Sequence, residues 1–301
     1  MLLVVAESNG SSPGRAGYKM AVASDGELSG SIGGGVMEVA LADAAKLRIE
    51  DGKFITRTEL VEQVHQKNSP DSSGMICSGR QTVIAKQLTT GDADAIIGII
   101  DALESGSETA LTISQDHLNV MPAKIETPKT SFEKHSETEF TYAEKIGVKN
   151  KLYIIGGGHC ALALSELMSR LGFRISIFDD RPELNTIAKN NFADVVTIIG
   201  GYDQIGEVIP NDNNIYVVVM TLGYKFDEIV IRKLFNHEFK YFGVLGSKAK
   251  MKTLLTTLEN EGFAKEKLQQ IHTPIGLPIS SRSPDEIAVS IAAEIIAVKN
   301  S

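Results

Sequence analysis

From residue 151 onward, short apolar runs alternate with segments of helical periodicity. The runs are LYIIG, RISIFDD, VVTIIG, IYVVVMT and YFGVLG. Strand-length apolar runs joined by helical crossovers predict a parallel sheet covered on both faces. We therefore expect a Rossmann-type, doubly wound parallel sheet over residues 150–301. Ser283, Pro284 and Glu286 form a capping-box pattern that predicts a last helix over residues 284–299.

The first part of the chain has a different pattern. Short alternating segments lie between glycine-rich stretches, a helical pattern follows over about 36–50, and another ends at Gly106. We expect an α/β domain over residues 1–125. Residues 126–149 read ETPKTSFEKHSETEFTYAEKIGVK, which is polar and holds few aliphatic residues. This composition predicts a linker between two domains.

Length and charge narrow the possible functions. A chain of 301 residues suggests two domains at roughly 150 residues each. The formal net charge is −8 and there is no dense Lys/Arg block, which argues against nucleic acid and an anionic membrane surface as partners. Two cysteines cannot form a disulfide framework, and no apolar run approaches a membrane span, so we expect a cytoplasmic protein.

A glycine loop follows the first apolar run of the second domain. Gly156, Gly158 and Ala161 have G-x-G-x-x-A spacing after a strand and at the start of a helix. The first glycine permits a tight turn, the second lets a pyrophosphate approach, and the alanine lets the helix pack closely. This pattern predicts binding of a nucleotide-containing ligand. The alternative is a glycine turn that only packs the helix on the strand.

The second strand of this domain ends in two acidic residues, Asp179 and Asp180. A carboxylate there would accept a hydrogen bond from a ribose 2′-hydroxyl, which favours NAD over NADP. Arg181, which follows directly, leaves room for a 2′-phosphate.

Other residues near these strand ends have two possible roles. His159 could contact a phosphate or transfer a proton, or it could cap nearby backbone, and Cys160 is expected to be a small packing residue. Ser247 and Lys248 follow the fifth strand at a helix start. They could hold an anion, or they could be an ordinary cap and a solvated lysine.

A second glycine cluster in the first domain leads directly into a helix. Consecutive glycines can present backbone N–H groups as a nest for an anion. A nearby loop supplies two basic residues, and a glutamate one turn into the helix could orient them. The candidate residues for an anionic small molecule are Arg15, Lys19, Gly33, Gly34, Gly35 and Glu38. The alternative is a simple tight turn.

Cys77 lies among small residues in GMICSG. It could be an accessible thiolate that handles sulfur or contacts a metal, or a buried cysteine.

Several motifs together resemble the XdhC/CoxI family, the accessory proteins of xanthine dehydrogenase and related molybdenum hydroxylases. The motifs are SSPGRAGYKM, GSIGGGVME, GMICSG, LYIIGGGHCALAL with FDDRPE, FGVLGSKAK and HTPIGLPISSRSPDEIAVSIAAEIIAV. The resemblance implies an amino-terminal XdhC/CoxI domain and a carboxy-terminal Rossmann domain. It also implies a protein that binds molybdenum cofactor (molybdopterin), supports its sulfuration with a cysteine desulfurase, and delivers it to the apo-enzyme.

The resemblance also assigns roles to particular residues. Arg15, Lys19 and the three glycines match family motifs and become candidates for binding the phosphate or pterin, and Cys77 becomes a candidate contact for the molybdenum. Ser78 replaces the first glycine that follows this cysteine in the family. The sequence also departs from the family at two other places: Val36 stands where members of the CoxI type often have cysteine, and residues 222–224 lack the histidines that many members have there.

Two alternative functions remain open at this stage. One is an NAD-dependent oxidoreductase, although no Tyr-x-x-x-Lys pair or His/Asp catalytic set is evident, so a cofactor chaperone without catalysis is preferred. The other is a nucleotide-sensing interaction module. Under either alternative, we expect NAD(P) in the Rossmann loop. Whatever its function, we expect the protein to be a homodimer.

Overall fold

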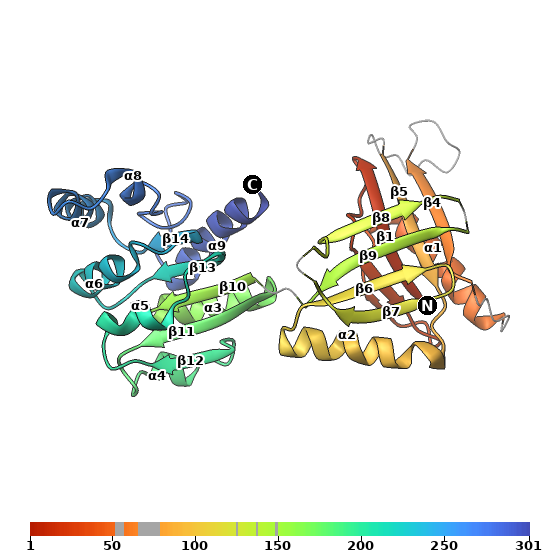
Figure 1. The fold of residues 1–301 in the computed structure, drawn as a ribbon, viewed down its shortest axis with the longest axis horizontal. Helices are drawn as coiled ribbons and strands as arrows, with labels where there is room; N and C mark the ends of the chain where they lie inside the picture. The colour runs from red at the N-terminus through yellow and green to blue at the C-terminus, as the bar shows by residue number, and fades with distance from the viewer. Residues whose placement is uncertain (52–56, 66–78, 125, 137, 148–149) are drawn as a thin grey trace. The chain divides into compact units, whose positions relative to one another are not determined.

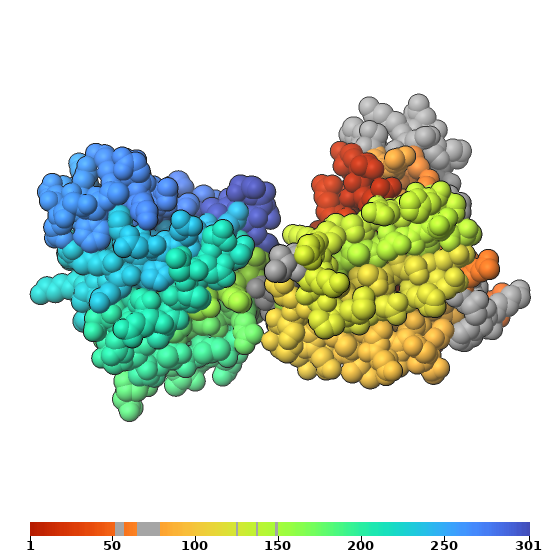
Figure 2. Space-filling view, viewed as in Figure 1, coloured from red at the N-terminus to blue at the C-terminus, as the bar shows by residue number. Residues whose placement is uncertain are grey.

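The structure is a computed structural model that describes residues 1–51, 57–65, 79–124, 126–136, 138–147 and 150–301. The chain divides into two compact units, residues 1–148 (unit 1) and residues 149–301 (unit 2). Figure 2 shows the surface of each unit. Within the described ranges, no helix combines the length and apolar character needed to cross a membrane.

Unit 1 contains a five-stranded antiparallel sheet (Figure 1). The order is β3 (Leu28–Gly30), β2 (Lys19–Val22), β1 (Leu2–Gly10), β5 (Gly79–Lys86) and β4 (Glu59–His65). Helix α1 (Gly35–Glu50) covers one face of this sheet, where Leu41 and Ala45 pack against Leu3 and Val5. Strand β1 is apolar at consecutive positions because both of its faces are buried.

A four-stranded antiparallel sheet covers the other face. Its order is β7 (Leu118–Pro122), β6 (Thr109–Ser114), β9 (Phe140–Ile146) and β8 (Thr130–Lys134). Val4 and Ile84 of the first sheet form one core with Leu111, Ile113 and Tyr142 of the second. Helix α2 (Ala93–Ser105) follows a short 3-10 turn (Thr90–Asp92) and ends at Gly106, whose φ of 68° is left-handed.

The predicted linker over residues 126–149 is wrong for residues 130–134 and 140–146, which form β8 and β9. Strand β9 lies inside the four-stranded sheet, between β6 and β8. Phe140, Tyr142 and Ile146 point into the core, and the residues between them are mostly polar. Because a strand buries only alternate residues, half of this segment can be polar while the strand is still anchored.

Unit 2 contains a five-stranded parallel sheet with helices on both faces (Figure 1). The order is β12 (Val195–Ile198), β11 (Phe173–Asp179), β10 (Asn150–Ile155), β13 (Asp212–Val219) and β14 (Phe239–Val244). The helices are α3 (His159–Arg170), α4 (Asn185–Ala188), α5 (Ile205–Val208) after a 3-10 turn (Tyr202–Gln204), α6 (Tyr224–Leu234), α7 (Lys248–Asn260), α8 (Lys265–Leu268) and α9 (Pro284–Asn300). The strand order confirms the predicted Rossmann-type sheet, and its direction of winding reverses between β10 and β13.

Helix α9 completes one face of this sheet. Ile291 and Ile295 share a core with Leu164 and Met168 of α3. The capping box predicted at the start of α9 is present: the Ser283 hydroxyl accepts from the Glu286 N–H, and the Glu286 carboxylate accepts from the Ser283 N–H. Lys299, near the end of α9, lies over the ring of Phe173 at the start of β11, so α9 ends at the amino edge of the sheet and begins, like α3, toward the edge where the parallel strands end.

Candidate functional site

The glycine loop connects β10 to α3 at the carboxyl edge of the sheet. Gly156 donates its N–H to the Phe178 carbonyl at 2.8 Å and has a φ of 107°. A Cβ at Gly156 would lie 2.3 Å from the Met220 carbonyl oxygen, so this position requires glycine. A Cβ at Gly158 would meet no described atom within 4 Å, so the loop is open to a ligand at that residue.

The amino end of α3 follows this open position directly. Gly158 is the N-cap residue, and no side chain caps the first-turn N–H groups. An uncapped helix amino end at the point where a parallel sheet reverses its winding favours a phosphate or another anion. The residues present therefore fit a phosphate-bearing ligand at this loop.

Gly157 is held from both sides. Its N–H donates to Asp179 Oδ2 at 2.6 Å, and its carbonyl accepts from the Thr186 hydroxyl at 2.5 Å. A Cβ at Gly157 would lie 2.6 Å from the Ile187 side chain. Thr186 and Ile187 lie in α4, far along the chain from the loop, and no sequence pattern indicated their contact. Together these contacts fix the loop before any ligand binds.

Asp179 has its hydrogen-bonding capacity filled by the protein. Besides Gly157, it accepts from the Arg181 backbone N–H at 2.9 Å and from Arg181 Nε and Nη2 at 2.8 and 2.7 Å. Burial alone would raise the pKa of Asp179, but these hydrogen bonds outweigh it and hold the pKa below its usual value. The side chain is fully buried, so a contact with a ribose hydroxyl would require Arg181 to move away.

Arg181 and Asp180 are the charged groups at this strand end that solvent can reach. Their side chains are 31% and 28% exposed, and Arg181 Nε lies 3.8 Å from Asp180 Oδ1. Arg181, the accessible cation, lies two residues after Asp179, which was predicted to bind the ribose. Asp179 itself positions the glycine loop. A ligand at this strand end would therefore contact a guanidinium before it reached Asp179.

Three further residues of α3 were singled out in the sequence. Ala161 is fully buried against the sheet, whereas His159 is exposed at the first helical position. Cys160 is half-buried and packs at the border of the same core, and burial raises the pKa of its thiol. These positions give Cys160 a packing environment and leave His159 available to a ligand.

The end of the fifth strand contains a capped helix. Ser247 is the N-cap of α7, and its hydroxyl accepts from the Lys250 N–H at 3.4 Å. Lys248 is exposed at the first helical position. The Ser247 hydroxyl already caps α7. This geometry favours an ordinary cap and a solvated lysine over an anion site at this pair.

The end of the fourth strand contains a buried acid that the sequence patterns did not single out. Asp227 accepts from the Thr221 hydroxyl at 2.6 Å and from the Thr221 N–H at 3.2 Å. Burial raises the pKa of Asp227. The sequence did contain a signal for this buried acid: an acidic residue lies one turn into the helix that follows a parallel strand.

The glycine nest of unit 1 is occupied by the chain's own carboxylate. Gly33, Gly34 and Gly35 have φ values of 128°, 76° and 71°. Glu38 Oε2 accepts from the Ser31 hydroxyl at 2.7 Å, the Ile32 N–H at 2.8 Å and the Gly34 N–H at 2.9 Å. Burial opposes the ionised form, but these hydrogen bonds and one from Gly33 lower the pKa of Glu38. Glu38 thus fills the nest that was predicted for an external anion.

The two basic residues predicted for this nest lie elsewhere. Lys19 Nζ is 2.5 Å from Glu144 Oε2 and donates to the Gly17 carbonyl at 2.9 Å. Glu144 belongs to β9, so Lys19 joins the two sheets of unit 1. Arg15 is exposed and forms no ion pair within the described part of the chain. The expectation that Glu38 orients both cations is therefore wrong.

A buried amide network supports the nest. The Gln81 side chain accepts from the Ser12 hydroxyl at 2.7 Å and from the Gly14 N–H at 3.1 Å, and donates to Gln63 at 2.8 Å. Gln81 is 2% exposed. A Cβ at Gly33 would lie 2.4 Å from Gly14 N, so the two loops are in direct contact. Gly33 therefore has a packing role, whereas a Cβ at Gly34 would meet no described atom within 4 Å.

Cys77 and Ser78 lie outside the described residues, so the role predicted for this cysteine stays a prediction. Among the residues that are described, no group of three or more His, Cys, Asp or Glu side chains is arranged to hold a metal ion.

Comparisons with known proteins agree with this two-unit architecture. The XdhC Rossmann domain matches residues 152–295, and the XdhC and CoxI family matches residues 1–59. A relative from Bacillus subtilis, named as a probable xanthine dehydrogenase subunit, is 26% identical over 98% of this chain and 92% of its own length. Uncharacterized protein YqeB from Escherichia coli is 23% identical over 98% of this chain, which spans 43% of the length of that relative.

A solved structure shares the fold of the whole chain. It is described as a xanthine dehydrogenase from Bacillus halodurans, and it aligns with a TM-score of 0.76 at 20% identity over 99% of this chain and 91% of its own. The family matches fall in the expected order, one in each unit, and the curated relatives align over nearly the entire sequence. The chain belongs to the XdhC and CoxI family.

Proposed function

We propose that this protein is an accessory factor that binds molybdenum cofactor and assists its sulfuration and its insertion into a xanthine dehydrogenase-like molybdenum hydroxylase. Family membership supports an accessory or maturation role toward such an enzyme. The names of the relatives from Bacillus subtilis and Bacillus halodurans refer to the same enzyme system. The partners in this proposal are the apo-hydroxylase and a cysteine desulfurase, and the protein acts as a cytoplasmic homodimer.

One observation carries the binding part of the proposal. The loop at Gly158 is open, α3 begins there without a side-chain cap, and contacts from Asp179 and Thr186 hold Gly157 in place. Molybdenum cofactor carries a terminal phosphate on its pterin. We assign that phosphate to the amino end of α3, with Arg181 as an accessible cation at the neighbouring strand end.

Unit 1 has a smaller role in this binding proposal than the sequence suggested. Its glycine nest is filled by Glu38, and Lys19 is bound to Glu144. Arg15 remains a candidate contact for the cargo because it is exposed. Cys77 remains the proposed residue for handling the sulfur or the molybdenum.

The test is direct binding of released cofactor. Cofactor freed anaerobically from a molybdenum hydroxylase is mixed with the purified full chain and passed through a gel-filtration column. Molybdenum and the fluorescent oxidised pterin are then measured in the protein fractions. We expect both to co-elute with the protein, and no retention at about 10 µM protein would contradict the proposal. Titration with NADH and NADPH by calorimetry, without cofactor, tests the nucleotide alternatives.

A further inference from the structure

Strand β14 is an edge strand of the unit 2 sheet. In a parallel ladder, alternate residues direct their backbone groups to opposite neighbours. Leu245 donates its N–H to the Val219 carbonyl of β13 at 2.8 Å, so the odd-numbered residues face β13. Lys240, Phe242 and Val244 therefore direct their backbone groups toward the free edge.

The chain itself covers the carboxyl half of this edge. The Val244 N–H donates to the His272 carbonyl at 3.0 Å, and the His272 N–H donates to the Phe242 carbonyl at 2.8 Å. Ile275 then donates to the Val244 carbonyl at 3.1 Å. Residues 272–275 thus lie along β14, with one parallel bridge between His272 and Gly243.

This cover stops at His272. Before it, the chain turns away after α8, because Gln270 and Ile271 donate their N–H groups back to Lys267 and Leu268. Outside the ladder with β13, no backbone hydrogen bond of the described residues reaches the Lys240 carbonyl or the N–H groups of Lys240 and Phe242. A hollow of 690 Å³ lies at this place, lined by residues from the start of β13, from residues 235–242 and from residues 267–272.

The walls of the hollow are aromatic and its charged groups are mostly basic. Phe235, Phe239 and Phe242 line it, and His237 stacks on Phe239 with ring centres 5.7 Å apart. The His237 Nδ1 atom is buried without a hydrogen-bond partner. The lining includes two lysines, Lys240 and Lys267, against one acidic residue, Glu238.

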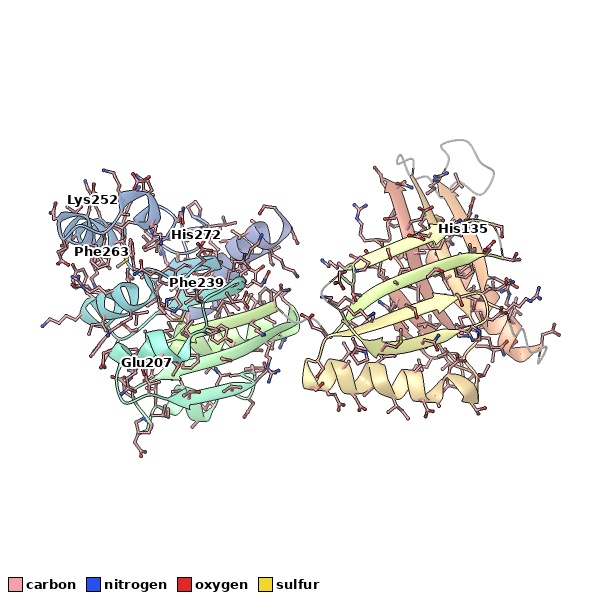
Figure 3. All side chains as sticks on the ribbon, viewed as in Figure 1. His135, Glu207, Phe239, Lys252, Phe263 and His272 are labelled. Atoms are coloured by element: carbon pink, nitrogen blue, oxygen red, sulfur yellow. The ribbon has the colours of Figure 1, made fainter. Side chains whose placement is uncertain are left out.

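The far side of the hollow is fixed by hydrogen bonds. His272 Nδ1 lies 3.2 Å from Glu294 Oε1, and Glu294 Oε2 accepts from the Tyr241 hydroxyl at 2.5 Å and the Gly276 N–H at 2.8 Å. Figure 3 labels His272 and Phe239, both of which line the hollow. His272, the first residue that covers β14, is therefore held in place by α9.

We propose that this edge binds an extended acidic segment of a partner protein. The segment adds to β14 as a short strand before residues 272–275, using the free backbone groups of Lys240 and Phe242. Lys240 and Phe242 lie on the same face of β14, so an apolar side chain of the segment enters the aromatic hollow on that face, and acidic side chains two residues before and after it reach Lys240 and Lys267. The surface lies at the amino ends of β13 and β14, whereas the glycine loop lies at the carboxyl ends of the strands, so the proposal is independent of cargo binding.

Fluorescence anisotropy with the full chain tests this proposal. The probe is a fluorescein-labelled peptide of about nine residues in which Glu and Val alternate at every second position, on one face of the strand, with Thr between them. We expect saturable binding, no binding of the matching Lys–Val peptide, and about tenfold weaker binding when the central amide is N-methylated and cannot donate. Lack of saturable binding at about 100 µM protein would overturn the proposal.

Two charge-reversal variants separate this site from general attraction. Lys240→Glu with Lys267→Glu is expected to weaken binding at least about tenfold, whereas Lys252→Glu, an exposed lysine of α7, is expected to leave it within about twofold. If the double variant melts at a lower temperature than the wild type, the N-methylated peptide gives the same test on unmodified protein. If the double variant binds the peptide as tightly as the wild type, the proposal is overturned. It is also overturned if the wild type self-associates and this variant does not, because the edge would then bind a second copy of the chain.

Discussion

Arg181 covers the buried carboxylate of Asp179 through its backbone N–H, Nε and Nη2, and Gly157 donates a fourth hydrogen bond. A carboxylate has about four acceptor positions, so none remains for a ligand. The residue that a dinucleotide-binding pattern would assign to ribose recognition therefore positions the glycine loop in this protein.

Asp179→Asn is expected to destabilise unit 2. The amide cannot replace the ionised acceptor of a buried, bidentate pair, and we expect a loss of about 2–4 kcal/mol in the free energy of unfolding. Differential scanning calorimetry checks this. Asp180→Asn is the control, since Asp180 is partly exposed and its ion pair is long, and should change stability by less than about 0.5 kcal/mol. Equal losses in the two variants would contradict the assigned role.

The same pair predicts a direction for the pH dependence. The pKa of Asp179 is lowered in the folded protein, so its contribution to stability is fully present above the unfolded-state pKa of about 4. That contribution is lost as the pH falls through the lower folded-state pKa. The difference in melting temperature between wild type and Asp179→Asn should therefore shrink below about pH 4, and a constant difference down to about pH 2 would be inconsistent with this pairing.

Removing Glu38 should turn the glycine nest of unit 1 into an anion site. Glu38→Ala leaves the Ile32 and Gly34 N–H groups without their acceptor, and a loss of about 1–3 kcal/mol is expected. Added sulfate should then raise the melting temperature of the variant more than that of the wild type, because binding stabilises the folded state. Glu27→Ala, at an exposed glutamate, is the control. If sulfate acts equally on all three proteins, the nest does not bind it.

Gly158→Asp should separate stability from cargo binding. Aspartate is a favoured N-cap, and a Cβ has free space at this position, so the melting temperature should stay equal or rise, corresponding to up to about 1 kcal/mol. Its carboxylate would occupy the place proposed for the phosphate, and retention of molybdenum cofactor should fall at least about tenfold.

The matched control for this change is Ser247→Asp, which places the same side chain at the N-cap of α7. It should leave cofactor retention intact. Loss of retention in this variant, and not in Gly158→Asp, would move the phosphate site to α7.

Cys160 should react slowly with alkylating agents. Its thiol is half-buried, and the raised pKa reduces the thiolate fraction at pH 8. In a Cys77→Ser variant, Cys160 is the single thiol of the chain. Its alkylation by iodoacetamide should be about tenfold slower in the folded protein than in urea. Similar rates in both conditions would show that the thiol is accessible.

The architecture of unit 2 could be predicted from its sequence because its signals are local. Apolar runs marked all five strands, and the glycine spacing and the Ser283 capping box marked two helix starts. The contacts made by Asp179 could not be predicted, because an acidic residue at a strand end does not reveal which donors reach it in three dimensions. Thr186 and Gly157, for example, are 29 positions apart in the chain.

Unit 1 was harder to predict because some of its strands pair with segments that are far away in the chain. Its strands are antiparallel and partly polar, so β8 and β9 resembled a linker in composition. In α1, the apolar residues Val36, Val39 and Leu47 are 56%, 58% and 65% exposed, and small residues such as Ala45 pack on the sheet. Helical periodicity located this helix correctly but could not show which side lies on the sheet.

The packing of α9 has a consequence for the order in which the protein folds during synthesis. Ile291 and Ile295 complete the core that α3 begins, and Glu294 joins Tyr241 of β14 to the turn at Gly276. Most of unit 2 will have left the ribosome before these residues are made, whereas unit 1 contains all of its own strands by residue 146. Unit 1 can therefore fold during translation, while the sheet of unit 2 must wait with one face covered only in part, by α3.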